Sequence, residues 1–122
     1  MDAVQIVNFA LAGLSIAFGA ICFLAPAYAM GALKLAPVGG QMDGKSEVRG
    51  ASGGAFIALG LAGMLFGPAW TVAWVMVGVH DAGAAAGRLL SFLFDGSGST
   101  KMWVYFIIEL VFAGWFIGAN WP

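Results

Sequence analysis

Residues 46–68 read SEVRGASGGAFIALGLAGMLFGP, a charged start followed by a largely apolar run that ends at a Gly-Pro pair. Ser46 is a good N-cap residue, and Glu47 stands in the first turn, where the helix dipole stabilises a carboxylate. About 20 apolar residues in a helix cross the ~30 Å hydrocarbon core of a bilayer, because each residue adds about 1.5 Å. We therefore predict a membrane-spanning helix over residues 46–66, ended by Gly67-Pro68.

Three further stretches of the chain are long and apolar enough to be spans. We predict them over residues 4–24, 69–94 and 101–118, separated by Gly, Pro and small polar residues that form turns. Residues 4–24 lack the basic start of a signal peptide, so we expect a true first span. The 69–94 stretch is long for one crossing, and a tilted helix accommodates the extra length. The prediction is an all-α fold, an integral membrane four-helix bundle in which residues 1–122 form a single domain.

The composition fits a chain whose solvent is largely lipid. Hydrophobic residues make up 61% of the 122 residues and charged residues only 9%, with a formal net charge of −1. Soluble domains carry about 25% charged residues. The five Lys and Arg residues are too few and too scattered to neutralise a run of phosphates, so we expect no nucleic-acid partner. Membrane lipids are the expected surroundings.

The basic residues predict an orientation. They are found around the first and third connections between spans, and none lies near the second connection or the two ends of the chain: Lys34, Lys45, Arg49, Arg88 and Lys101. Since cytoplasmic loops of membrane proteins are enriched in Lys and Arg, these two connections are predicted to face the cytoplasm. We expect a multi-pass protein of the bacterial inner (cytoplasmic) membrane with both termini periplasmic.

Glycines spaced four residues apart predict where helices pack. Gly50 with Gly54 and Gly83 with Gly87 are two such pairs. Small residues at this spacing form a flat strip on one helix face, which lets a second backbone approach closely. We expect these strips to contact either other helices of the same chain or a partner, a membrane protein or a second copy of this chain.

Charged residues inside spans are the best pointers to function, because they are costly in lipid and usually face the protein interior. Five residues qualify: Glu47, Arg49, Asp81, Arg88 and Glu109. Asp81 and Arg88 are seven residues apart, which places them on nearly the same helix face. We predict that Glu109 pairs with Arg49 or Arg88, with Asp81 nearby. The network is either a structural set of ion pairs or a polar pocket that binds a ligand.

The chain offers little for catalysis or for metals. His80 and Cys22 are the single histidine and cysteine, and neighbouring residues such as His80 and Asp81 point about 100° apart on a helix, so they form no dyad by themselves. No clustering of ligands typical of a zinc or di-iron site is found. We expect no catalytic residues, no metal and no cofactor.

Several short elements share an order and spacing with a known pattern: Glu47-Val48-Arg49, Gly53-Gly54, Gly87-Arg88, Asp95-Gly96 and Glu109. Over about residues 45–112 the chain resembles a bacterial family of small four-helix membrane proteins of unknown function, itself distantly similar to the DoxX-like group. The resemblance implies a four-helix fold and implies that Glu47, Arg49, Arg88 and Glu109 form one constellation. It implies no reaction.

Two hypotheses for function follow. The first is a non-enzymatic structural or accessory subunit of a larger membrane complex, favoured by the small size and the lack of a catalytic constellation. The second is a binder of, or an enzyme acting on, a small lipid-soluble molecule such as a quinone or lipid, held in the polar pocket of the cytoplasmic half. A proton- or ion-coupled transporter is a third alternative, and it would require oligomerisation or a water-filled path.

Overall fold

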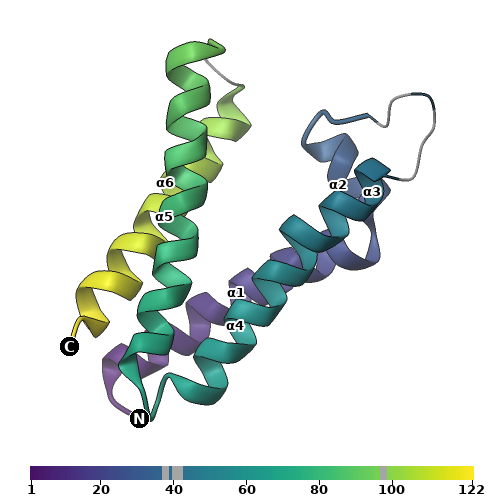
Figure 1. The fold of residues 1–122 in the computed structure, drawn as a ribbon. Helices are drawn as coiled ribbons and strands as arrows, with labels where there is room; N and C mark the ends of the chain where they lie inside the picture. The colour runs from purple at the N-terminus through teal and green to yellow at the C-terminus, as the bar shows by residue number, and fades with distance from the viewer. Residues whose placement is uncertain (37–38, 40–42, 97–98) are drawn as a thin grey trace.

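The computed structural model describes residues 1–36, 39, 43–96 and 99–122, and these residues form helices and no strands. The prediction of an all-α fold is confirmed. Figure 1 shows the elements in chain order: α1 (Ala3–Leu24), α2 (Pro26–Ala32), α3 (Asp43–Glu47), the π-helical segment η2 (Val48–Gly54), α4 (Ala55–Phe66), α5 (Thr71–Phe94) and α6 (Thr100–Asn120).

Within the described residues, three helices are long and apolar enough to cross a membrane. They are α1, the continuous helix Asp43–Phe66 made of α3, η2 and α4, and α6. Helix α5 has 24 residues but is not among these three, since it carries His80, Asp81 and Arg88. The predicted span over residues 69–94 therefore has the length to cross but a more polar composition.

The helix boundaries differ from the sequence prediction at two N-termini. The second long helix begins at Asp43, so the prediction that Ser46 caps it is wrong: Ser46 lies inside α3. The last helix begins at Thr100, one residue before the predicted start, and Ser99 stands at its cap position. In both cases more than one residue suited to an N-cap lies near the start of the helix, so the sequence does not select among them.

The long helices are arranged as two antiparallel pairs. Helix α1 packs along η2 and α4, and α5 packs along α6. The two pairs meet at the end of the molecule that holds both termini and the α4–α5 connection, and they diverge toward the other end, which holds α2, α3 and the α5–α6 connection (Figure 1). We call these the closed end and the open end.

Helix α1 packs closely against η2 and α4 through glycines other than the predicted ones. A Cβ atom at Gly19 would lie 2.8 Å from the carbonyl oxygen of Gly53, and one at Gly53 would lie 2.8 Å from the backbone nitrogen of Phe23. One at Gly60 would lie 3.1 Å from the carbonyl oxygen of Ala12. These positions have no room for a larger residue, so glycine lets the two backbones touch.

Of the two kinds of contact expected for Gly50, Gly54, Gly83 and Gly87, the structure lacks the contact with other helices of this chain, and contact with a partner stays a prediction. A Cβ at Gly50, Gly83 or Gly87 would meet nothing within 4 Å, and one at Gly54 would meet only the carbonyl oxygen of Arg49 in its own helix. Spacing by four identifies a strip of small residues but not the direction in which it faces. Gly50 and Gly54 also lie in the π-helical segment, whose wider turn breaks the four-residue register.

The closed end is densely packed. Trp74 and Phe116 are both buried and stack with ring centroids 5.8 Å apart, and Phe9 meets Trp74 edge-on at 5.4 Å. Ala12 and Val77 complete this core, which therefore draws side chains from α1, α5 and α6. Packing at this end fixes the point at which the two helix pairs meet.

A neutral polar network crosses the same end. The Asn8 side-chain amide donates to the Asn120 side-chain oxygen at 2.7 Å, and Trp115 Nε1 donates to the Asn8 side-chain oxygen at 2.9 Å. The Asn120 amide also donates to the backbone oxygen of Phe116 at 3.0 Å. These bonds tie α1 of one pair to α6 of the other, and both asparagines are buried.

Candidate functional site

The strongest polar contact between helices joins Arg88 of α5 to Glu109 of α6. Arg88 Nε donates to Glu109 Oε2 at 2.7 Å and Arg88 Nη2 donates to Oε1 at 2.8 Å. This is the two-pronged geometry in which a planar guanidinium best matches a carboxylate. The side chains are 25% and 10% exposed, so the pair is largely shielded. Arg49 and Arg88 were the two partners predicted for Glu109, and in the structure Glu109 pairs with Arg88.

Arg88 is held by two further contacts from α6. Its Nη1 lies 3.5 Å from the sulfur of Met102, and its guanidinium carbon lies 5.4 Å from the centre of the Tyr105 ring. The second distance is within the range of a cation–π contact. The guanidinium is therefore fixed against α6, and both charges of the pair belong to the α5–α6 hairpin.

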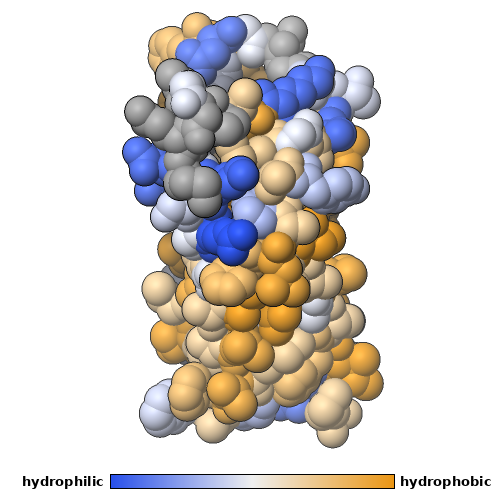
Figure 2. Space-filling model, turned by 90° about the vertical axis from the view of Figure 1, so that its right-hand side faces the viewer, coloured by the Kyte–Doolittle hydropathy of each residue, from blue (hydrophilic) through white to orange (hydrophobic). Residues whose placement is uncertain are grey.

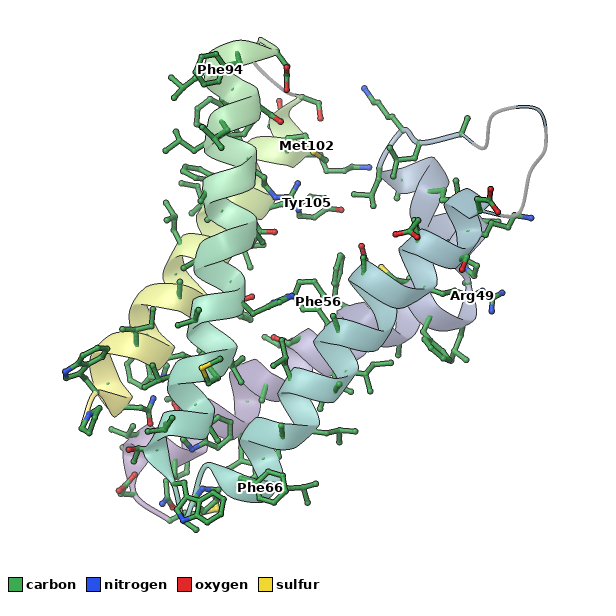
Figure 3. The ribbon with its side chains drawn as sticks, viewed as in Figure 1. Arg49, Phe56, Phe66, Phe94, Met102 and Tyr105 are labelled. Carbon is green, nitrogen blue, oxygen red and sulfur yellow. The ribbon has the colours of Figure 1, made fainter. Side chains whose placement is uncertain are left out.

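Glu47 and Arg49 do not join this pair. Both are exposed, on α3 and η2 of the other helix pair, and Figure 3 shows Arg49 pointing away from the space between the pairs. The prediction of one constellation formed by Glu47, Arg49, Arg88 and Glu109 is therefore wrong. Both residues lie in the first turns of the second long helix, at the open end, where the two pairs have already diverged.

Besides Glu109, Asp81 is the charged residue that is buried in the described part of the chain. It is 2% exposed, and its Oδ2 atom has no hydrogen-bond partner. Its Oδ1 lies 3.9 Å from Nδ1 of His80, which is longer than a hydrogen bond. The His80 ring instead meets Phe56 edge-on, with centroids 4.6 Å apart. Asp81 is thus a buried carboxylate with one oxygen, Oδ2, that accepts no hydrogen bond.

A cavity of about 360 Å³ lies between the two helix pairs and joins these groups. Its walls come from α1, α4, α5 and α6 and are mostly apolar, with the charged groups on the α5–α6 side: Leu14, Ser15, Phe18, Phe56, Asp81, Arg88, Tyr105, Ile108, Glu109 and Phe112. Figure 3 shows Phe56 and Tyr105 projecting from opposite pairs into this space. The predicted neighbours Asp81, Arg88 and Glu109 therefore share one cavity.

The aromatic walls of the cavity are connected. Phe18 of α1 meets Phe56 of α4 at 5.2 Å and Tyr105 of α6 at 6.3 Å, both in edge-to-face orientation. Phe18 thereby bridges the two helix pairs. Sequence reasoning missed these three residues because aromatic residues are also abundant on lipid-facing surfaces, and no local signal separates the two environments.

The composition of the cavity is typical of a binding site for a small molecule. Across the described residues there is no group of three or more His, Cys, Asp and Glu that could hold a metal ion. Ser15 donates its hydroxyl to the backbone oxygen of Leu11 at 3.2 Å. The cavity instead combines an apolar body with a few polar groups on one wall, as small-molecule sites do.

Comparison with known proteins places the chain in a family but not in a functional class. No curated protein and no solved structure matches it. The family model described as "Domain of unknown function (DUF4345)" matches residues 3–119, which is nearly the whole chain. The resemblance to a family of unknown function is thereby confirmed at this level, while the link to the DoxX-like group stays a prediction. The chain belongs to the family defined by this domain of unknown function.

Proposed function

We propose that this protein is an integral membrane protein that binds a small lipid-soluble molecule in the cavity between its two helix pairs. The observation that carries the proposal is the buried Asp81 carboxylate at the wall of a cavity of about 360 Å³, whose Oδ2 atom has no hydrogen-bond partner. That volume lies within the range of small-molecule sites, roughly 300–1,000 Å³.

A purely structural role would account for Arg88 and Glu109 but not for Asp81. A buried ion pair whose hydrogen bonds are complete can simply specify how two helices pack. A buried carboxylate without a partner is costly, particularly in a chain surrounded by lipid. A ligand that fills the cavity and reaches Asp81 would remove that cost, which is why binding is favoured over packing alone.

The rim of the cavity supports access from the bilayer. Leu14 and Ile108 line the cavity and are 60% and 44% exposed. They belong to α1 and α6, which have few contacts with each other. An opening bordered by exposed apolar residues suits a molecule that arrives dissolved in lipid rather than in water.

The same proposal includes an orientation in the bacterial inner membrane, with the open end at the cytoplasm and both termini periplasmic. Its support is the position of the basic residues, since the structure brings the α5–α6 connection and the α2–α3 region to one end (Figure 1). On one face of the molecule, hydrophilic side chains gather at this end while apolar side chains cover most of the remainder (Figure 2). Such asymmetry agrees with the positive-inside rule.

Native mass spectrometry of the protein in mild detergent tests the binding proposal. We expect a one-to-one adduct of a small molecule on the unmodified protein. Leu14→Trp would place an indole at the rim of the cavity and should abolish the adduct. Leu65→Trp is the matched control, because Leu65 is 71% exposed on α4 and does not line the cavity. An adduct that survives Leu14→Trp, or none in any form of the protein, would contradict the proposal.

An accessory role in a larger membrane complex is the second proposal. Its support is the open face of α5 around Gly83 and Gly87, where a Cβ atom would meet nothing within 4 Å. Such a face allows close approach by a helix of a partner or of a second copy. Gly83→Leu should then dissociate an oligomer or complex measured by light scattering in detergent, whereas a monomer of unchanged mass before and after substitution would contradict this role.

A further inference from the structure

The cavity wall also indicates what kind of polar group a ligand would carry. This inference rests on the proposed binding function. We infer that the ligand is a lipophilic amine, an apolar body with a protonated nitrogen that donates a hydrogen bond to Asp81. Three independent features of the cavity support it: the free acceptor, the balance of charge and the aromatic walls.

The free hydrogen-bonding capacity of the cavity is that of an acceptor. An ionised carboxylate accepts hydrogen bonds and donates none. Glu109 already accepts from two nitrogens of Arg88, while Asp81 Oδ2 accepts from no group. A ligand that donates a hydrogen bond would give Asp81 Oδ2 the partner that it lacks. Against an ionised carboxylate, a quinone, which presents only carbonyl acceptors, would place oxygen against oxygen.

The charge of the cavity favours a cation over a neutral donor. The residues that line it include two carboxylates, Asp81 and Glu109, and one guanidinium, Arg88. His80, the titratable group that approaches Asp81 most closely, lies 3.9 Å away and packs against Phe56. Lys101 lies outside the cavity and donates to the backbone oxygen of Ala32. A single positive charge on the ligand would balance the second carboxylate, and opposite charges attract strongly where water is scarce.

The aromatic walls provide the remaining recognition. A cation is attracted to the face of an aromatic ring within about 6 Å. The ring of Tyr105 already has Arg88 at 5.4 Å, which leaves Phe18 and Phe56 for the ligand. These two side chains come from the α1–α4 pair, so a bound amine would contact Asp81 of one helix pair and the phenyl rings of the other.

Three probes of the same length separate the possibilities: phenylbutylamine, phenylbutanol and the methyl ether of phenylpropanol. The amine donates and is charged, the alcohol donates and is neutral, and the ether only accepts. Binding to the protein in detergent is measured by isothermal titration calorimetry. We expect the amine to bind on the order of tenfold more tightly than the ether, since hydrogen bonds to charged groups are the strong ones. The alcohol should bind with an affinity between those of the amine and the ether, because it donates a hydrogen bond but carries no charge.

Asp81→Asn should erase the preference for the amine while leaving ether binding unchanged, because the amide keeps the shape of the carboxylate but not its charge. The matched control is Asp95→Asn, the same chemical change at the exposed residue that follows the end of the same helix, outside the cavity. It should leave the preference intact. If Asp81→Asn does not fold, Asp81→Ser serves the same purpose, and the comparison of probes on the unmodified protein stands without either variant.

The possible failures are distinguishable. Equal binding of amine and ether, both lost in Leu14→Trp, would overturn the inference about the ligand and leave the binding proposal standing. Equal binding of amine and alcohol would overturn the assignment of a cation. If none of the three probes binds in a manner sensitive to Leu14→Trp, the proposed function and the inference both fall.

Discussion

The closed end and the open end both bury polar side chains, but the bonds between those buried side chains join different parts of the molecule. At the closed end, Asn8 and Asn120 connect α1 to α6 and so tie one helix pair to the other. At the open end, Arg88 and Glu109 connect α5 to α6, two helices of the same pair. The first bond closes the space between the pairs, and the second leaves it open.

The two ends also differ in how completely their polar groups are satisfied. The two amides and Trp115 bond to one another, and the Asn120 amide bonds in addition to a backbone oxygen. The charged groups of the open end leave Asp81 Oδ2 without a partner. A satisfied neutral network specifies packing, while unused capacity beside a cavity indicates a site for something else. This contrast is the basis of the functional proposal.

Removing the packing of the closed end should have the largest effect. Trp74→Ala takes a buried ring from between Phe9 and Phe116 and leaves a cavity, so the free energy of unfolding should fall by about 3 kcal/mol. Trp70→Ala is the control, because Trp70 is 69% exposed. Unfolding is followed by circular dichroism in mixed detergent micelles. Equal losses in the two variants would show that the closed end is not the packed core.

Breaking the ion pair of the open end should have a somewhat smaller effect. Glu109→Gln removes the negative charge that Arg88 faces, at a site that is partly exposed, and should lower the free energy of unfolding by roughly 2 kcal/mol. Unfolding in detergent measures it, with Asp95→Asn as the control for loss of an exposed carboxylate. An unchanged unfolding midpoint in Glu109→Gln would mean that the pair contributes nothing to the fold.

Breaking the amide network should cost less still. Asn8→Ala removes the group that bonds to Asn120 and Trp115, and interhelical hydrogen bonds in membranes contribute about 1 kcal/mol. A double-mutant cycle with Asn120→Ala should show that the two substitutions are not additive. Additive losses would indicate that the two side chains do not interact.

The smallest stability effect and the largest binding effect should coincide in Leu14→Trp. The residue is exposed at the rim of the cavity, so the free energy of unfolding should change by less than about 0.5 kcal/mol. Probe binding should be lost. Asn8→Ala should show the reverse, reduced stability with unchanged binding of phenylbutylamine. Loss of binding in both variants would mean that the two ends are not separate in function.

The helical fold was predictable because long apolar runs allow few structures in lipid, where every backbone group must be bonded within the chain. The involvement of Asp81, Arg88 and Glu109 was predictable for a related reason, since charges inside apolar helices face the interior. The contact of Arg88 rather than Arg49 with Glu109 was one of two open alternatives. Choosing between them required knowing which helices pair.

Features that depend on how helices are rotated against one another were not predictable. Gly50 and Gly83 belong to pairs spaced by four, as do Gly63 and Gly67, which pack against Trp74, yet a Cβ at Gly50 or Gly83 would meet no neighbour. Asn8 was a detectable signal, an amide in a largely apolar run, but its partner Asn120 lies 112 positions away. The cavity exists because the two helix pairs diverge. This divergence depends on both pairs together, so it cannot be predicted from any single segment of the sequence.

The most direct test of the account is an experimental structure of the protein in lipid nanodiscs at a resolution that shows small molecules. We predict density for a bound ligand between Phe56 and Tyr105, with the polar end of the ligand within hydrogen-bond distance of Asp81 Oδ2. A cavity closed by contact between the two helix pairs, with Asp81 bonded to Arg88 or His80, would contradict it.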